Sequence, residues 1–349
     1  MCWQKLARKE EGIDMPNDPT AFVGSKFVTL CVRPSGRGRV SQLGWTTPKT
    51  MIVGSEDYSD KPRYIANVFF NWPEISLIWL VDHGEHFSSW TYLGKYEGQH
   101  VLAIHQLDGR VVLRAYHDGD AVESCNLPSP SSDLVAGSVL SVTIDYHDGN
   151  LIYTSRTGLE VYHVASGQCI HRVARGDGSL RASAVSPSGL LAYVFDDCPI
   201  DLFDLKTGLS TQISRQLTPW SIEGGTPDSL VFHKDQLIVT AGWNETPPIY
   251  LIDANKIEVV GVVSTGFERN YGAMTAGDGD NWVVWGTRKD EWDGVDDLRL
   301  CYGATIIGRA SSFQAEQAAL SPDGCHIALL RDNLLHVGRI DQLFRPINN

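Results

Sequence analysis

From residue 26 onward, the hydrophobic positions form short runs rather than a helical repeat. Runs rich in Val, Ile, Leu, Tyr and Thr recur between turns made of Gly, Asp, Asn, Ser and Pro, a pattern typical of antiparallel strands joined by tight turns. The clearest unit spans residues 141–173, where a His-Asp-Gly-Asn, an Arg-Thr-Gly and an Ala-Ser-Gly turn separate four runs. We therefore predict a four-stranded meander here, and residues 182–214 repeat the pattern.

The turns also give the number of repeats. The first hairpin turn of each unit recurs at intervals of about 40 to 51 residues, the period of four-stranded propeller blades. These turns are marked by Lys49, Gly98, Gly149, Gly189, Asp235, Gly279 and Gly324. The last turns form a second series at Trp72, Gly119, Gly167, Gly208, Asn255, Gly303 and Asp341. Both series have seven members, so the sequence predicts an all-β fold, a seven-bladed β-propeller of four-stranded antiparallel blades.

The two ends of the chain are expected to meet in the last blade. The final unit has three clear strands, at 317–320, 326–330 and 334–338, but only a weak fourth candidate at 343–347. Residues 27–32 form an unassigned strand before the first complete unit. Because an unpaired edge strand is a hazard, we predict that this N-terminal strand closes the ring. The domains are then an N-terminal extension, 1–25, and the propeller, 26–349.

Two strings resemble repeats of the WD40 type. Residues 321–324 read Ser-Pro-Asp-Gly and are followed by Cys-His-Ile-Ala-Leu-Leu, similar to the first turn and second strand of such a repeat. Residues 200–208, Ile-Asp-Leu-Phe-Asp-Leu-Lys-Thr-Gly, resemble its third strand and last turn. At the family's Trp-Asp position stand Phe203-Asp204, Tyr162-His163 and Ile252-Asp253. The resemblance implies a divergent WD40-like propeller, a fold that hosts many activities.

Loop length distinguishes the two faces of the predicted ring. The first turns of the units are mostly tight, whereas the opposite face receives the longer loops 56–63, 82–90, 127–138, 216–228, 242–248, 264–271 and 286–297. Long connections in compact domains are often functional. Aromatic and arginine side chains dominate many interfaces, and these loops supply Trp90, Trp220, Trp243, Phe267, Arg269, Tyr271 and Trp292. We predict that these residues bind a partner protein; the alternative for each is packing of a loop onto the blades.

An enzymatic alternative centres on one histidine-rich loop. Residues 82–86 read Asp-His-Gly-Glu-His, and His83 and His86 could supply two metal ligands at the mouth of the channel. The acidic run 290–297 could ligate Ca²⁺, although it has no EF-hand spacing. No nucleophile elbow, phosphate-binding loop or dinucleotide fingerprint is found. We expect a non-enzymatic interaction module without a cofactor, and keep a metal-dependent hydrolase or lyase as the alternative.

Charge and composition narrow the choice of partner and compartment. The chain has 42 acidic and 29 basic residues and a formal net charge of −13, which repels nucleic acid and anionic lipid. No apolar run approaches the roughly 20 residues of a membrane span, and residues 1–16 lack the pattern of a secretory signal. Seven scattered cysteines without a Cys-x-x-Cys pair indicate reduced, mostly buried thiols. We expect a cytoplasmic protein.

Overall fold

The computed structural model describes most of the chain, and most of that part is β-strand. The described residues are 6–8, 27–31, 39–47, 50–56, 64–71, 76–96, 99–106, 108–117, 120–135, 142–174, 178–196, 198–213, 227–241, 248–275, 279–288, 296–313, 315, 317–331 and 334–346. They contain strands β1 to β29 and two four-residue helices, α1 (Ser132–Val135) and α2 (Ile340–Leu343). None of the described helices has the length or apolar character to span a bilayer.

Three sheets are the four-stranded antiparallel meanders that the turn pattern predicts. The first contains β10 (Thr143–His147), β11 (Asn150–Ser155), β12 (Gly158–His163) and β13 (Gln168–Ala174). The second contains β14 (Leu180–Val185), β15 (Leu190–Phe195), β16 (Ile200–Asp204) and β17 (Ser210–Ile213). The third contains β18 (Pro227–His233), β19 (Gln236–Ala241), β20 (Ile249–Asp253) and β21 (Glu258–Val263). In each sheet the strands pair in sequence order, so each is built from local hairpins.

Two further sheets gain strands from the chain ends. One contains β22 (Phe267–Thr275), β23 (Asn281–Arg288), β24 (Asp296–Tyr302), β25 (Thr305–Phe313) and β29 (Arg345–Pro346). The other contains β26 (Gln317–Leu320), β27 (His326–Arg331), β28 (Leu334–Arg339), β2 (Phe27–Cys31) and β1 (Leu6–Arg8). The pairing of β2 with β28 confirms that an N-terminal strand completes the last unit. The weak candidate at 343–347 was assigned wrongly, because β29 pairs with β25 of the preceding sheet.

The remaining sheet has seven strands and changes the expected blade count. It contains β3 (Arg39–Thr47), β4 (Thr50–Glu56), β5 (Tyr64–Asn71), β6 (Ser76–Tyr96), β7 (Gln99–Gln106), β8 (Val111–His117) and β9 (Asp120–Leu127). We predicted seven blades, whereas six sheets are hydrogen-bonded separately. The difference lies in β6, which pairs with β5 through its first half and with β7 through its second half. The predicted loop 82–90 is therefore a continuous strand.

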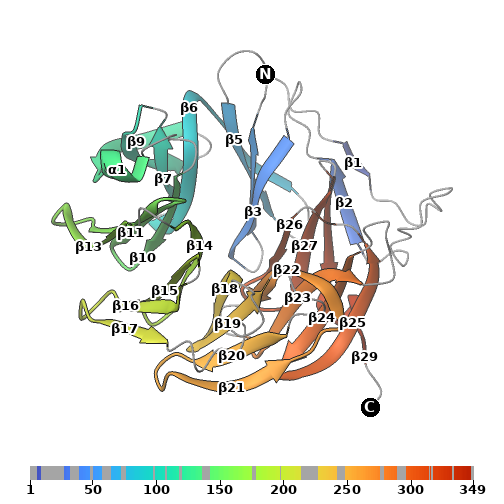
Figure 1. Cartoon of the computed structure of the whole chain (residues 1–349). Coiled ribbons are helices and arrows are strands. Elements are labelled where there is room, and N and C mark those ends of the chain that lie inside the picture. Colours follow the sequence, from blue (N-terminus) through green and yellow to red (C-terminus); the bar gives the residue numbers. More distant parts are fainter. Residues whose placement is uncertain are drawn as a thin grey trace.

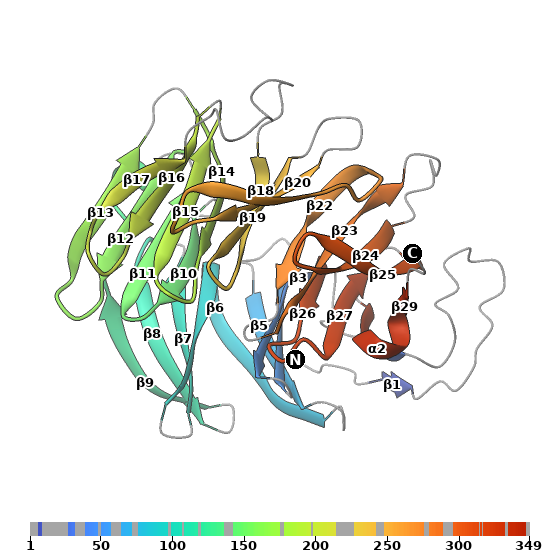
Figure 2. The same cartoon turned by 90° about the horizontal axis from the view of Figure 1, so that it is seen from below.

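The sheets follow one another around a closed ring (Figure 1). Along the ring β6 contacts β10, β11 contacts β14, β14 contacts β18, β18 contacts β22, β22 contacts β26, and β26 contacts β3. At the last of these junctions the Trp45 indole N–H donates to the Ala319 carbonyl at 3.2 Å, and its ring lies 6.2 Å from that of His326. Figure 2 shows the same blades from the side. The fold is thus a β-propeller of antiparallel blades.

The tight turns repeat in atomic detail. Gly189 N–H donates to Ser186 O at 3.0 Å and Gly324 N–H to Ser321 O at 2.8 Å. In both turns the serine hydroxyl accepts the N–H of the next strand at 2.8 Å, from Leu190 and His326 respectively. The β10–β11 hairpin instead turns through Asp148 and Gly149, with φ values of 43° and 80°, which Asp-Gly pairs tolerate. The predicted first turns thus fall between the strand pairs expected of them.

The core lies between the faces of successive sheets. Ile152 and Val161 of one sheet pack with Leu191 and Phe203 of the next, and the other described junctions repeat this arrangement. The middle strands therefore face protein on both sides, and β15 reads Leu-Leu-Ala-Tyr-Val-Phe without a polar residue. Burial of apolar surface on both faces stabilises the ring and fixes the spacing of its blades.

A buried histidine in this core gives the fold a pH dependence. His105 of β7 is fully buried, 6.5 Å from the ring of Tyr153. Burial lowers its pKa from 6.5 to about 4, and the nearby Asp108 opposes the shift only in part. Below pH 6.5 the unfolded chain binds a proton that the folded chain excludes until about pH 4, so stability falls across this window.

We expect His105→Gln to reduce that pH dependence. Between pH 7.5 and 4.5 the fall in the free energy of unfolding should shrink by about 2–3 kcal/mol relative to the wild type. Urea unfolding at both pH values measures this, and His163→Gln, at an exposed position, is the matched control. Parallel pH profiles for wild type and His105→Gln would contradict the assignment.

Candidate functional site

Three of the seven predicted partner-binding residues lie outside the described residues, but the strands on either side locate their connections. Trp220 belongs to the connection between β17 and β18, Trp243 to that between β19 and β20, and Trp292 to that between β23 and β24. These strands belong to three consecutive sheets of the ring. In a four-stranded antiparallel meander, the connection between the second and third strands and the connection from the last strand to the next sheet leave from the same end of the sheet. The strand ends that flank these three connections therefore lie on one face of the ring.

Two other predicted residues were assigned wrongly to exposed loops. Trp90 lies in β6 and is only 9% exposed. Phe267 is the first residue of β22 and is fully buried, with the Arg299 guanidinium 4.6 Å from its ring centre. That guanidinium also pairs with the buried carboxylate of Asp297 at 3.2 Å. Neither ring is available to a partner, because strand pairing carries both into the core.

The last two predicted residues, Arg269 and Tyr271, are also in a strand. Both fall in the first half of β22, where Arg269 lies opposite Thr287 of β23. The register shifts between Asn270 and Gly272, so the backbone of Tyr271 sits at an irregularity in the ladder. The predicted loop 264–271 is thus reduced to the short turn before Phe267.

The histidine-rich segment has a different setting from the predicted loop. His83 and His86 are both residues of β6, and His86 lies opposite Tyr64 of β5. Within the described ranges no group of three His, Cys, Asp or Glu side chains is placed to hold a metal ion. In the acidic run, residues 290–295 lie outside the described residues. The carboxylate of Asp297 is buried against Arg299 and serves the core.

The cysteines only partly follow the prediction of buried thiols. Cys301 is buried, and burial raises its pKa to about 12. Cys198 is half-buried, whereas Cys169 and Cys325 are exposed. All four are free thiols.

The structure describes the first part, residues 128–135, of the long connection between β9 and β10. Residues 128–135 follow β9 and contain α1, whose Leu134 is buried. The Tyr153 hydroxyl donates to the Pro128 carbonyl, and the Thr157 hydroxyl donates to the Leu134 carbonyl at 3.4 Å. Burial raises the pKa of Tyr153 above its ordinary value, so this phenol stays protonated and keeps donating. Both contacts hold the connection against the β10–β13 sheet.

The firmest anchor of this connection is the buried carboxylate of Glu160, which is 2% exposed. It accepts the Ser131 N–H at 2.8 Å, the Ser131 hydroxyl at 2.5 Å and the Tyr162 hydroxyl at 3.2 Å. The Arg172 guanidinium lies 2.8 Å away and supplies the balancing charge. A buried carboxylate is retained only where donors and a counter-charge satisfy it. Glu160 therefore fixes the connection relative to the ring.

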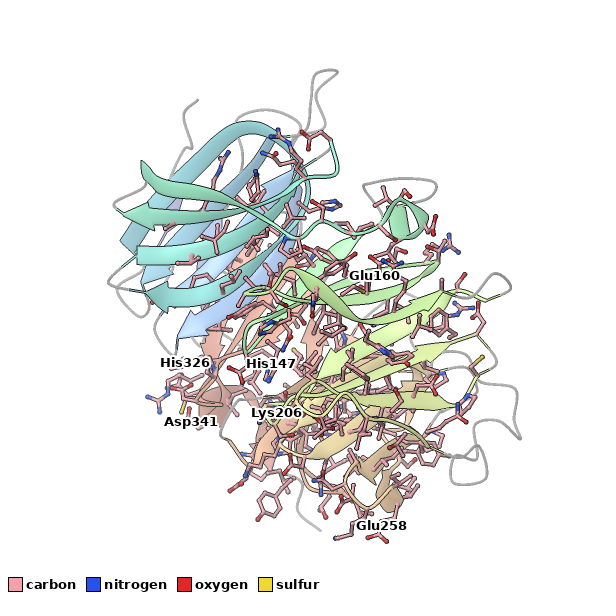
Figure 3. The ribbon with its side chains drawn as sticks, turned by 90° about the vertical axis from the view of Figure 1, so that its left-hand side faces the viewer. His147, Glu160, Lys206, Glu258, His326 and Asp341 are labelled. Atoms are coloured by element: carbon pink, nitrogen blue, oxygen red, sulfur yellow. The ribbon has the colours of Figure 1, made fainter. Side chains whose placement is uncertain are left out.

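Figure 3 separates the anchor from the tight turns. His147 ends β10, Lys206 lies in the turn after β16, His326 begins β27 and Asp341 lies in α2 after β28. These four residues lie together on one side, while Glu160, which holds the 128–135 connection, lies away from them.

Several large apolar side chains remain exposed away from the candidate face. Among the described residues they are Ile170, Leu209, Val260, Val262, Tyr302 and Ile307. Ile170, Val260 and Val262 lie on the outermost strands β13 and β21, and Leu209 directly precedes the outermost strand β17. Tyr302 ends β24, and Ile307 lies in β25. Sequence periodicity did not single them out, because alternation along a strand does not tell an outermost strand from an inner one.

No model of a known protein family matches the chain, and no curated protein matches it significantly. The propeller arrangement therefore rests on the strand pairing and the ring contacts described above.

We expect Glu160→Gln to loosen the 128–135 connection. The amide offers one acceptor oxygen where the carboxylate offers two. Its NH₂ then faces either the donors Ser131 N–H and Tyr162 hydroxyl or the donors Ser131 hydroxyl and Arg172. The free energy of unfolding should fall by about 2 kcal/mol, measured by urea unfolding, and amide exchange in 128–135 should accelerate. Tyr162→Phe, which removes only the longest of the bonds, should cost about 1 kcal/mol or less. Wild-type stability and exchange in Glu160→Gln would contradict the anchoring role.

Proposed function

We propose that this chain is a non-enzymatic protein-interaction module that binds a partner protein through the face carrying the long connections. The proposal is supported by chain order, because Trp220, Trp243 and Trp292 fall between strands β17 and β18, β19 and β20, and β23 and β24 of three consecutive sheets. Tryptophan supplies a large contact area at interfaces. A rigid scaffold also loses little conformational entropy when a partner binds. Trp220, Trp243 and Trp292 form the proposed contact set, with Arg269 and Tyr271 at its border.

The Glu160 anchor supports this use of the face. The connection 128–135 occupies the same place between sheets as the connection that carries Trp220. Its hydrogen bonds to Glu160 and Tyr153 hold it to the neighbouring blade. A loop that is already ordered loses less conformational entropy when a partner binds.

We further propose that the ring is a divergent WD40-like propeller with seven functional blades. The seven-stranded sheet divides into two four-strand units if β6 is shared between them, since its halves pair with different neighbours. The matching hydrogen bonds of the turns at Ser186 and Ser321 support a common repeat. Asp204 and Asp253, at the family's Trp-Asp position, each accept two backbone N–H groups of the following turn.

The net charge of −13 favours a partner with a basic surface. Its field repels phosphate backbones and anionic membranes and accelerates encounters with positively charged proteins. We propose a protein partner in the cytoplasm rather than nucleic acid or lipid.

Alanine replacement of the three tryptophans tests the proposed face. We expect the triple variant Trp220→Ala, Trp243→Ala and Trp292→Ala to lose partners at least about tenfold in quantitative pull-downs, because interface tryptophans are frequent hot spots. Tyr302→Ala, which removes an exposed aromatic at the end of β24, beside the β24–β25 turn, is the control and should retain them. Undiminished recovery of every partner by the folded triple variant would rule out this surface.

A further inference from the structure

The outer wall of the ring carries an apolar edge strand. β21 (Glu258–Val263) is the last strand of the β18–β21 sheet, and no described strand pairs with its outer edge. In Figure 3 Glu258, at the start of this strand, lies at the periphery of the molecule. An outermost strand presents backbone N–H and C=O groups that another extended chain can pair with.

The two faces of β21 differ in what they offer. Val260 and Val262 are 43% and 52% exposed, and Val260 is the extra residue where the register of β21 shifts against β20. Gly261 points to the other face, where a Cβ atom would lie 2.7 Å from the Cβ of Ala304 in the next sheet. The turn that contains Ala304 covers the β21 backbone at Gly261. An added strand would therefore contact the exposed side chains of Val260 and Val262.

Two other outer strands are covered, and a third begins with polar residues. β29 pairs with the outer edge of β25, and β1 pairs with the outer edge of β2. These two pairings show that blades of this ring accept a fifth antiparallel strand. β17 begins with exposed Ser-Thr-Gln, whereas β21 has four valines and a glycine after Glu258, without a further charge or a proline. Its irregularity is the bulge at Val260.

We propose that the edge of β21 binds an extended segment of a partner protein by strand addition, separate from the tryptophan-bearing face. The segment carries β-branched or aromatic residues at alternate positions, matching Val260 and Val262, and basic residues beside them. The basic flank follows from charge: Asp253 and Glu258 share the single ammonium of Lys256, at 3.0 and 3.8 Å, on a chain with a net charge of −13. The same charge repels a second copy of the chain.

A second copy is also disfavoured by size. Antiparallel pairing of β21 with itself would join only the six residues of this strand, whereas a stable interface needs roughly 800 Å² from each partner. A peptide segment needs no such area, since backbone pairing and two side-chain contacts give a weak, specific complex.

The test uses a fluorescein-labelled peptide, acetyl-Lys-Lys-Val-Thr-Val-Thr-Val-Lys-Lys-amide, titrated with the full chain by fluorescence anisotropy. We expect saturable binding and increased protection of the β21 amides from hydrogen exchange. Val260→Thr with Val262→Thr keeps the strand shape but removes the apolar contact, and should weaken binding about fivefold. Leu209→Thr, an equally mild change on the neighbouring sheet at a 68% exposed position, should leave the affinity within about twofold.

Two matched peptides separate backbone pairing from charge. N-methylation of alternate amides should abolish binding, because it removes the strand's donors, and replacement of the four lysines by glutamate should weaken it strongly. The triple tryptophan variant should bind the peptide like the wild type, which separates this edge from the face above. No saturable binding up to about 1 mM, or equal binding by Val260→Thr with Val262→Thr, would overturn the proposal. A concentration-dependent dimer abolished by that double variant, without peptide binding, would assign the edge to a second copy.

Discussion

Closure of the ring is the constraint on which the rest of the structure depends. The β14–β17 sheet packs apolar residues against a neighbour on each face, and a sheet without a neighbour would expose that surface to water. The closing junction joins β26 to β3, and the sheet that contains β26 is completed only by the N-terminal strand β2. Residues about 300 positions apart in the chain are thereby held together, and the ring cannot open without losing a strand pairing as well as apolar contacts.

Closure of the ring also divides the surface into two faces and an outer wall. Once the strands run outward from the axis in antiparallel order, tight turns gather on one face and longer connections on the other, as Figure 3 shows for the turns. The outermost strands form the wall. Glu160 joins the core to this surface, because its buried carboxylate binds Tyr162 and Arg172 of the β10–β13 sheet and also Ser131 of the 128–135 connection. The rigid core can therefore support recognition at places that contribute little to its own stability.

Local patterns in the sequence predicted the hairpins well, since each depends on neighbouring residues. Asp148-Gly149 and the Ser-Pro-x-Gly turns at 186 and 321 fold where the pattern places them. The segment 82–90 was predicted wrongly, because its polar residues resemble a loop and only pairing with both β5 and β7 makes it a strand. The Ser-Trp-Thr-Tyr sequence at residues 89–92 alternates in polarity and was the available signal. The role of Glu160 was beyond prediction, since its partners Ser131 and Arg172 come from other strands and connections.

The most direct test of ring closure is native-state hydrogen exchange, resolved by mass spectrometry, on the segments 27–31 and 334–339. If β2 completes the last sheet, the amides of both segments are protected and become exchangeable together, because antiparallel partners open as one unit. Rapid exchange of 27–31 while 334–339 stays protected would contradict closure by the N-terminal strand, and with it the constraint from which the rest of the fold follows.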